Sequence, residues 1–427
     1  MYIKNMQVTY RQPIKHSLLL FEMSREAACI YNKAIAINKQ GKNFKDLAIA
    51  IDSSHETLYL HSQSAQAAYQ LWIQNMKSYF GSVVEYEKNP SKFKNVPQPP
   101  YKTKFMQPIT FKKSAIRHID GFLYLSIKKP FDPIKIRWNE NLPIPEWIII
   151  SYNRFTGWNI NYVLEKKTSM INSLDFEKEK VMAIDLGVKR VATTFDGEHC
   201  ITYSGKELMS LTRLKNKINA ETKIKLSRCK NGSKRHKRIC RANRKLARKI
   251  DNKQKDILHK TSRTIVNDAI ANNVSRIVIG DCGSIHDKTN CGKQNQKIQQ
   301  NPEQKLRKYV EYKFQSVGGD TEVPSERGTS STCPRCKHKH KPSNRTFKCP
   351  NCGFIYDRDG VGAVNIYRQD VSLSEEEFLL NVVGRMTRPR GRRYHSREKC
   401  TLPLNEKWSL VVCEAARSRF VEETPLL

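Results

Sequence analysis

The stretch VMAIDLGVKRVATTFDG, residues 181–197, contains two runs of apolar and β-branched residues joined at LGVKR. Runs of about four to eight such residues, bounded by glycine, are typical of strands. The first run carries an acid, Asp185, at its end. The sequence therefore predicts a mixed α and β domain that begins near residue 180 and presents a carboxylate at the end of its first strand.

A third strand of the same domain is indicated by SRIVIGDCGSI, residues 275–285. Ile277–Ile279 form the apolar run, Gly280 interrupts it, and Asp281 follows. Because side chains alternate between the faces of a strand, Asp281 is expected on the face opposite to that of Gly280. By position alone, Asp281 is either a catalytic acid or a turn residue. A helical pattern, TSRTIVNDAIANN, precedes this strand, and a second one, NPEQKLRKYVEYKFQSVGG, follows it.

The most uneven charge lies between these strands, since residues 213–260 hold 19 lysines and arginines and three acids. Ile239, Leu246, Ile250 and Ile257 recur at helical spacing, which predicts two long basic helices around a turn at KNGSKRH. Such a run can be a solvated helix face, but so large an excess of cations favours contact with phosphates. The candidate nucleic-acid-binding residues are Arg235, Lys237, Arg238, Arg241, Arg244, Lys245 and Arg248.

The whole chain of 427 residues has a formal charge of +35. Such an excess needs a polyanion to offset its self-repulsion, and nucleic acid is the first candidate. An anionic membrane is the alternative, but no window approaches the roughly 18 apolar residues of a spanning helix. The N-terminal sequence MYIKNMQVTYRQPIK lacks the apolar core of a signal peptide. We therefore expect an intracellular protein with no membrane partner.

The cysteine cluster CPRCKHKHKPSNRTFKCPNC consists of two CxxC knuckles separated by twelve residues. Two such knuckles place four thiolates around one tetrahedral zinc ion, and because all four positions are filled, the zinc is expected to be structural. His338 and His340 are expected at the surface near nucleic acid rather than as ligands. The predicted zinc ligands are Cys333, Cys336, Cys349 and Cys352.

A second acidic candidate follows the cysteines directly, in FIYDRDGVGAVNIYR. Asp357 and Asp359 precede a short apolar helix, so a capping role is the simplest interpretation of either. The combination of Asp359 with Asp185 in a very basic chain favours another role. Carboxylates that converge on one site can hold two magnesium ions roughly 4 Å apart for phosphodiester hydrolysis.

The N-terminal part of the chain has a different pattern. Residues 16–87 read as helical, and in SQSAQAAYQLWIQNMKSYFGSVVEY an apolar stripe recurs at helical steps, which favours bundle core over a base-stacking surface. The linker KNPSKFKNVPQPPYK is rich in proline and lysine and is expected to be extended and exposed. From residue 110 to 165, short β-type runs predict a small barrel or sandwich. The stripe comprises Ala65, Tyr69, Trp72, Met76, Phe80 and Val83.

Five features together resemble the TnpB family of transposon-encoded RNA-guided DNA endonucleases, which is related to type V CRISPR effectors and Fanzor proteins. They are AIDLGVKRVATT, the basic helical pair, IVIGD, GTSSTCPRC with CPNCG, and DRDGVGAVNI. The resemblance covers roughly residues 1–368. It implies a guide RNA, a double-stranded DNA target cut beside a short adjacent motif, two catalytic magnesium ions, and a prokaryotic cytoplasm near the nucleoid. We expect a monomer with one RNA.

The resemblance also implies a multidomain α+β architecture: a RuvC-like nuclease of RNase H fold with a zinc-ribbon insertion, preceded by a wedge β-barrel that carries a helical recognition insertion. The expected barrel comprises 1–15 and 101–170, and the recognition domain 16–100. The expected nuclease domain comprises 180–330, with the basic pair at 211–260, and 356–369, while the ribbon spans 331–355 and a loosely ordered tail 370–427.

Carried over residue by residue, Asp185 matches the first acid of the family and Asp359 the last. Where the family pattern has a catalytic glutamate after the third strand, this chain has Gly280. The resemblance implies that some members carry the glutamate on a nearby strand just before the zinc segment, and Glu326 in VPSERGTSSTCP fits that description. We therefore expect the catalytic set Asp185, Glu326 and Asp359, with Asp281 as a turn or supporting residue.

Three alternatives remain open. A nuclease-dead RNA-guided DNA-binding protein would have the same fold, and both GGDTEVPSERG and GVGA depart from the family pattern. A transposase that joins DNA strands would use similar carboxylates, since one fold supports several chemistries. A zinc-ribbon binding protein without catalysis would explain the charge and the cysteines, but not Asp185 on its strand.

Overall fold

The computed structural model describes residues 5–38, 57–93, 95–103, 106–153, 156–167, 180–281, 300–371, 373–387 and 389–392. These residues form two compact units, one within 5–167 and one within 180–392, which are described separately. Within the described residues, no helix has the length and apolar character needed to cross a membrane.

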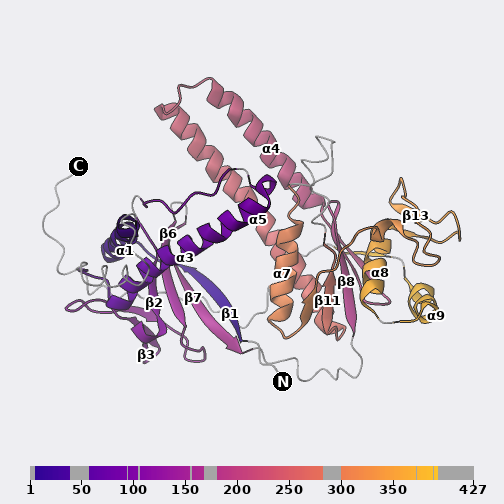
Figure 1. Cartoon of the computed structure of the whole chain (residues 1–427), viewed down its shortest axis with the longest axis horizontal. Coiled ribbons are helices and arrows are strands. Elements are labelled where there is room, and N and C mark those ends of the chain that lie inside the picture. The colour runs from indigo at the N-terminus through magenta and orange to yellow at the C-terminus, as the bar shows by residue number, and fades with distance from the viewer. Residues whose placement is uncertain are drawn as a thin grey trace. The chain divides into compact units, whose positions relative to one another are not determined.

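The first unit packs helices against two small antiparallel sheets (Figure 1). The helices are α1 (Leu18–Asn38), α3 (Ser62–Lys88) and the 3-10 turn η1 (Pro90–Lys92). One sheet contains, in spatial order, β1 (Asn5–Pro13), β7 (Gly157–Lys167), β6 (Trp147–Asn153) and β2 (Ile109–Lys112). The other contains β3 (Ile116–Ile119), β4 (Phe122–Leu125) and β5 (Ile134–Arg137), with the turn η2 (Lys113–Ala115) before it.

A single apolar core joins the helices and sheets of this unit. Trp72 on α3, Phe111 on β2 and Trp158 on β7 are among its most buried side chains. The predicted stripe on α3 is therefore core at Trp72 and Met76, but the buried residues of this helix stop at Met76 and Phe80 is 50% exposed. The helices predicted within residues 16–87 are confirmed at Leu18–Asn38 and Ser62–Lys88, while residues 39–56 lie outside the described residues. The predicted β region is confirmed, whereas closure of the strands into a barrel stays a prediction.

The second unit is a mixed six-stranded sheet between helices, with the order β12-β11-β8-β9-β10-β15. Its first strands are β8 (Val181–Leu186), β9 (Arg190–Phe195) and β10 (Cys200–Ser204), and β9 is antiparallel to both β8 and β10. β11 (Arg276–Ile279) is parallel to β8, and β12 (Asp320–Glu322) is parallel to β11. The two strands expected within residues 181–197 and the strand at Ile277–Ile279 are thus confirmed.

Alternation along the central strand assigns each face of the sheet to different helices. Met182 and Ile184 pack with apolar residues of α5 (Lys234–Ala271) and α7 (Glu303–Gln315). Val181 and Ala183 pack with Ile366 of α8 (Arg358–Asp370) on the other face. Asp185 continues this second series, so the strand directs its carboxylate toward α8.

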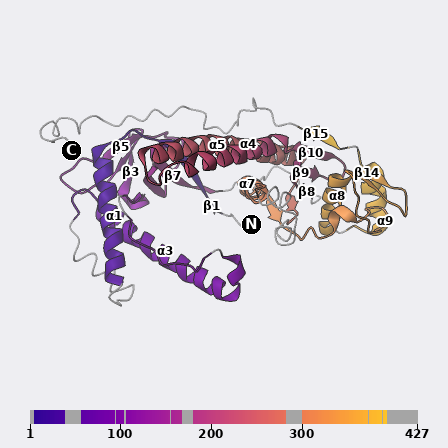
Figure 2. The ribbon, with the colours of Figure 1, turned by 90° about the horizontal axis from the view of Figure 1, so that it is seen from above.

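The basic region forms a long antiparallel hairpin of α4 (Lys206–Ser227) and α5, side by side in both views (Figures 1 and 2). Gln254 donates to Thr212 at 2.9 Å, and Lys215 pairs with Asp251 at 2.6 Å. Two details differ from the expectation. Leu246 is 41% exposed rather than part of the seam, and α5 continues without a break through the segment predicted as a separate helix.

The expectation of a loosely ordered tail is wrong for its first part. After α8, α9 (Glu375–Glu377) leads into a π-helical turn η5 (Phe378–Val382) and a 3-10 turn η6 (Val383–Arg385). Phe378 and Val382 are buried against β9, β10 and α8, and β15 (Arg390–Arg392) pairs in parallel with β10. Residues 393–427 lie outside the described residues. The first part of the tail is ordered because Phe378 and Val382 pack on a buried surface of the sheet and α8. The sequence pattern alone does not reveal this surface.

Candidate active site

The candidate site lies on the α8 face of the sheet, at the end of β8. A Cβ placed on Gly362 of α8 would lie 2.6 Å from Oδ2 of Asp185. Real Cβ atoms do not approach an oxygen so closely, so any larger residue at 362 would require the Asp185 carboxylate to shift. The sequence GVGA, which departs from the family pattern, therefore makes room for the first acid.

Gly280 lies beside Asp185, because Ile279 of β11 pairs with Ile184 of β8 and the N–H of Gly280 donates to the Ile184 carbonyl at 3.0 Å. A Cβ placed on Gly280 would lie 2.8 Å from Oε2 of Glu326 and 2.8 Å from Cδ1 of Ile366. The Glu326 carboxylate thus occupies the space that a side chain at 280 would enter. It reaches the same face of the sheet as Asp185.

The segment that carries Glu326 is held by the neighbouring strand and by α8. Asp281 donates its N–H to the Pro324 carbonyl at 2.9 Å and forms an isolated parallel bridge with Ser325. Thr329, in the turn η4 (Thr329–Ser331), donates its hydroxyl to the Glu326 carbonyl at 2.9 Å. The buried Asn365 of α8 donates to the Thr329 and Thr332 carbonyls, both at 2.7 Å. These bonds fix the backbone on both sides of Glu326.

Asp281 points to the opposite face, as the alternation predicted. Its Oδ1 accepts from Arg307 of α7 at 2.9 Å. Arg307 is also within 3.4 Å of Glu311 on the same helix. The structure therefore separates Asp281 from the face on which Asp185 and Glu326 lie.

The acids at the start of α8 have different contacts. Asp357 is the N-cap, and its Oδ1 accepts from the N–H groups of Asp359 and Gly360 at 3.1 and 3.2 Å. The capping role therefore belongs to Asp357, which also pairs with Arg190 of β9. Oδ2 of Asp359 lies 3.1 Å from Arg345 and 3.4 Å from Arg190. Asp359 is thus held at the helix start by two guanidinium groups.

The charges of the neighbouring acids affect the pKa of Asp185. Burial raises the pKa of the Asp185 carboxyl well above its ordinary value, and the negative charges of Glu326, Asp359 and Glu303 raise it further. Only Arg358 among the named neighbours opposes this shift. Carboxyl groups whose negative charges repel one another have raised pKa values, and such clusters are a common feature of sites that bind cations.

The donor chemistry fits two different metals. Carboxylate oxygens are hard ligands of the kind magnesium prefers, and Gly280 and Gly362 place no Cβ against the carboxylates of Glu326 and Asp185. The four cysteine sulfurs lie within 4.8 Å of one another, with Cys333–Cys352 and Cys336–Cys349 at 3.6 and 3.5 Å. Zn–S bonds of about 2.3 Å give a tetrahedral S–S edge of about 3.8 Å, so these residues could hold zinc.

The zinc hairpin is built by β13 (Thr346–Lys348) and β14 (Ile355–Asp357). Hydrogen bonds, first from the backbone N–H of His338, lower the pKa of the Cys336 thiol to about 6. Burial raises the pKa of the Cys333 thiol to about 12. His338 is exposed, and the four-cysteine set contains no histidine. The hairpin also carries Arg345, so it contributes a side chain to the carboxylate site.

Most of the predicted nucleic-acid-binding residues are accessible. Arg248 is partly buried, while the other six are exposed on α5. Those six are Arg235, Lys237, Arg238, Arg241, Arg244 and Lys245.

Sequence reasoning missed Arg190, Asn365 and Glu303. Arg190 and Asp357 are 167 positions apart, and Asn365 contacts the Glu326 segment across 36 positions. No local pattern links such pairs. Glu303 is 6% exposed at the start of α7, where an acid is ordinarily only a helix-terminus residue.

Comparison with known proteins finds relatives for parts of the chain. Residues 165–285 match the OrfB_IS605 family profile, described as a probable transposase, and residues 304–366 match the Cas12f1-like TNB domain. A TnpB-like protein of Methanocaldococcus jannaschii is 28% identical over 229 residues, which cover 50% of this chain and 80% of that protein. A TnpB-like protein of Acanthamoeba polyphaga mimivirus is 30% identical over 145 residues, which cover 32% of this chain and 26% of that protein.

The fold is similar to that of Cas12f1 in its complex with single guide RNA and target DNA. The TM-score is 0.51 at 16% identity, with 81% of each chain covered. The chain is therefore similar to OrfB-type and TnpB-like proteins over these residues, and its fold is similar to that of a Cas12 effector. Together these matches support a TnpB-type protein.

Proposed function

We propose that the chain is an RNA-guided DNA endonuclease with a RuvC-like site formed by Asp185, Glu326 and Asp359. The observation that carries the proposal is the Glu326 carboxylate in front of Gly280, beside the strand that bears Asp185. The matches to OrfB-type and TnpB-like proteins and the Cas12f1-like fold support the same kind of activity. Asp281, paired with Arg307, lies outside the proposed catalytic set.

The chain's own residues have distinct tasks in this proposal. Two magnesium ions, when bound, would activate water and stabilise the leaving oxygen of the phosphodiester. Asp185 and Glu326 provide ligand oxygens from β8 and from the segment after β12. Asp359 would contribute the third carboxylate once it leaves Arg345 and Arg190. The zinc hairpin braces α8, because Arg358 donates its N–H to the Arg345 carbonyl at 2.7 Å.

Binding is proposed to rest on the basic hairpin. The exposed cations of α5 hold the phosphates of a guide RNA and its heteroduplex, while base pairing selects the DNA target. We propose one RNA per protein monomer and action on DNA in a prokaryotic cytoplasm.

Strand transfer is the second candidate, because the matched family is described as a probable transposase. One experiment separates the two. The protein is expressed with its transposon-end RNA, purified, and incubated with magnesium and plasmids that do or do not match the guide. The nuclease proposal expects co-purifying RNA and broken plasmid only with the match. Joined DNA without any RNA requirement would favour strand transfer, and bound but uncut matched plasmid would indicate a targeting protein.

A further inference from the structure

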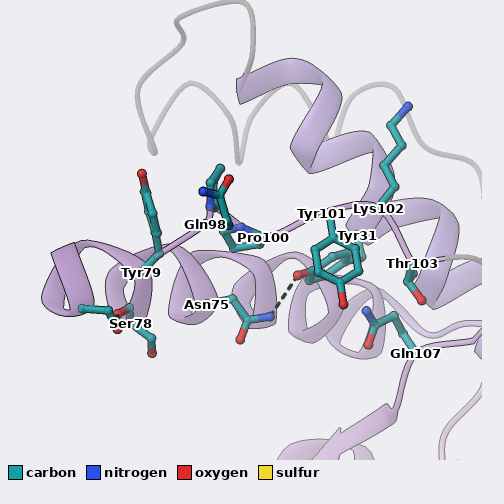
Figure 3. Close-up of a pocket in the computed structure, with 12 residues that line it drawn as sticks. Tyr31, Asn75, Ser78, Tyr79, Gln98, Pro100, Tyr101, Lys102, Thr103 and Gln107 are labelled. Atoms are coloured by element: carbon teal, nitrogen blue, oxygen red, sulfur yellow. Dashed lines mark hydrogen bonds between the residues drawn. The ribbon is translucent and has the colours of Figure 1, made fainter. Parts of the chain in front are cut away.

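A cavity of about 640 Å³ lies within the first unit, between α1, α3 and the extended segment that follows η1 (Figure 3). Its lining includes three tyrosines, Tyr31, Tyr79 and Tyr101. Tyr31 forms part of the floor, is 4% exposed, and its hydroxyl accepts from Asn75 at 2.9 Å. Tyr101 is 85% exposed at the rim. The cavity is large enough for one or two nucleotides by the usual size of ligand sites.

The charge and polarity of the lining restrict the ligand. Among the described residues that line the cavity, Lys102 carries a charge and none is an acid. Asn75, Gln98 and Gln107 add amide groups, which can both donate and accept. Aromatic faces, amides and a lysine match a heterocycle that is joined to a phosphate.

The wall that bears Tyr101 is held in place before any ligand arrives. At one end, Asn89 donates its N–H to Glu85 at 3.0 Å, and Phe93 packs edge-on against Tyr86. At the other end, the Asn32 side chain bonds both the N–H and the carbonyl of Thr103, at 2.8 and 2.9 Å. Pro97, Pro99 and Pro100 restrict the backbone between these ends. A wall fixed in this way loses little conformational freedom on binding.

We propose that this cavity binds an unpaired nucleobase of a single-stranded nucleic acid, with the base stacked on Tyr101 and its phosphate at Lys102. Figure 3 shows Tyr79 projecting from α3 toward the segment with Gln98 and Pro100, so a second aromatic face borders the same space. The proposal rests on the proposed function in one respect, that the chain binds nucleic acid. The unpaired strand is either RNA or displaced DNA, since both present the same base and phosphate.

The test is photocrosslinking of the full-length protein, freed of nucleic acid, to short single-stranded RNA and DNA that contain 5-iodouridine or its deoxy form. High salt suppresses contacts that rest on phosphates alone. The crosslinked peptides are then mapped. We expect a crosslink at Tyr101 or Tyr79 with one or both strands, and the strand that reacts identifies the source. Crosslinks confined to α4 and α5 would overturn the cavity proposal while leaving nucleic-acid binding intact.

Affinity supplies the second readout. Stacking is worth about 1–3 kcal/mol per base, so Tyr101→Ala should weaken binding of fluorescent oligouridylate or oligothymidylate by roughly 5- to 150-fold. Tyr101→Phe should retain the affinity, and Tyr152→Ala, at a tyrosine 44% exposed on β6, should not change it. Because Tyr101 is so exposed, its loss leaves the core intact. Equal affinity of wild type and Tyr101→Ala would reject the site. Absence of any binding by wild type would reject the proposed function as well.

Discussion

Gly280 and Glu326 share one space: a Cβ on Gly280 would lie 2.8 Å from the Glu326 carboxylate. A side chain at 280 would therefore require the Glu326 carboxylate and the end of Ile366 to shift. Since Gly280 lies beside Asp185 on the α8 face, the carboxylate of Glu326 occupies the position that a glutamate at 280 would fill. The relationship explains why this chain can have glycine where its family pattern has an acid.

Asp185→Asn should stabilise the metal-free protein at neutral pH. A raised pKa means that the carboxyl favours folding below its unfolded pKa of about 3.9, and that this contribution is lost as pH rises through the folded pKa. The amide has no charge to lose. In metal-free buffer, thermal unfolding should show a higher Tm for Asp185→Asn at neutral pH and no difference at acidic pH. A lower Tm than wild type at neutral pH would contradict the raised pKa.

Cys349→Ser should reduce the zinc content and the cleavage activity together. The chain is expected to carry about one zinc ion, measured by mass spectrometry of the purified protein. Loss of a thiolate loosens the hairpin that carries Arg345 and leads into α8. Cys240→Ser on α5, outside the cluster, is the matched control and should keep both properties. A Cys349→Ser protein that retains its zinc would disprove the ligand assignment.

Alanine at Arg238, Arg241 and Arg244 together should weaken RNA and DNA binding across all sequences. Each lost phosphate contact should lower the slope of log affinity against log salt by about 0.7–0.9. Lysine at the same three positions keeps the charge and should keep most of the slope. The measurement is anisotropy over a salt series. A loss confined to one target sequence would contradict a phosphate-binding role.

Truncation should divide the tail into two parts. A chain that ends after Arg392 keeps Phe378, Val382 and β15 and should fold as wild type. A chain that ends after Val371 loses both buried side chains, which are worth about 3–6 kcal/mol together, and should unfold at a lower temperature. Equal Tm values for the two truncations would show that residues 374–392 add nothing to this unit.

The sequence predicted the features that are local. The strands around Asp185, the strand before Gly280 and the cysteine cluster follow from short patterns with fixed spacing. The features that it missed depend on distant partners. Leu246 has helical spacing but lies where α5 has no buried seam, and β15 forms only because β10 offers a free edge.

In the candidate site, too, some features follow from local sequence patterns and others depend on distant contacts. Asp185 and Asp359 could be predicted from a strand end and a helix start, and the direction of Asp281 from simple alternation. The position of Glu326 beside Gly280 depends on the pairing of the segment after β12 with Asp281 and on Asn365 of α8. For this residue, the sequence supplied a hypothesis from resemblance, and the contacts supply the physical reason.

The third acid of the proposed site is assigned to Glu326. The assignment is tested by comparing wild type, Glu326→Ala and Asp281→Ala in magnesium-dependent cleavage of guide-matched plasmid, with binding to the same plasmid measured in parallel. We predict that Glu326→Ala binds but loses cleavage by at least about 100-fold, whereas Asp281→Ala still cuts. Cleavage that survives Glu326→Ala and disappears in Asp281→Ala would contradict the assignment.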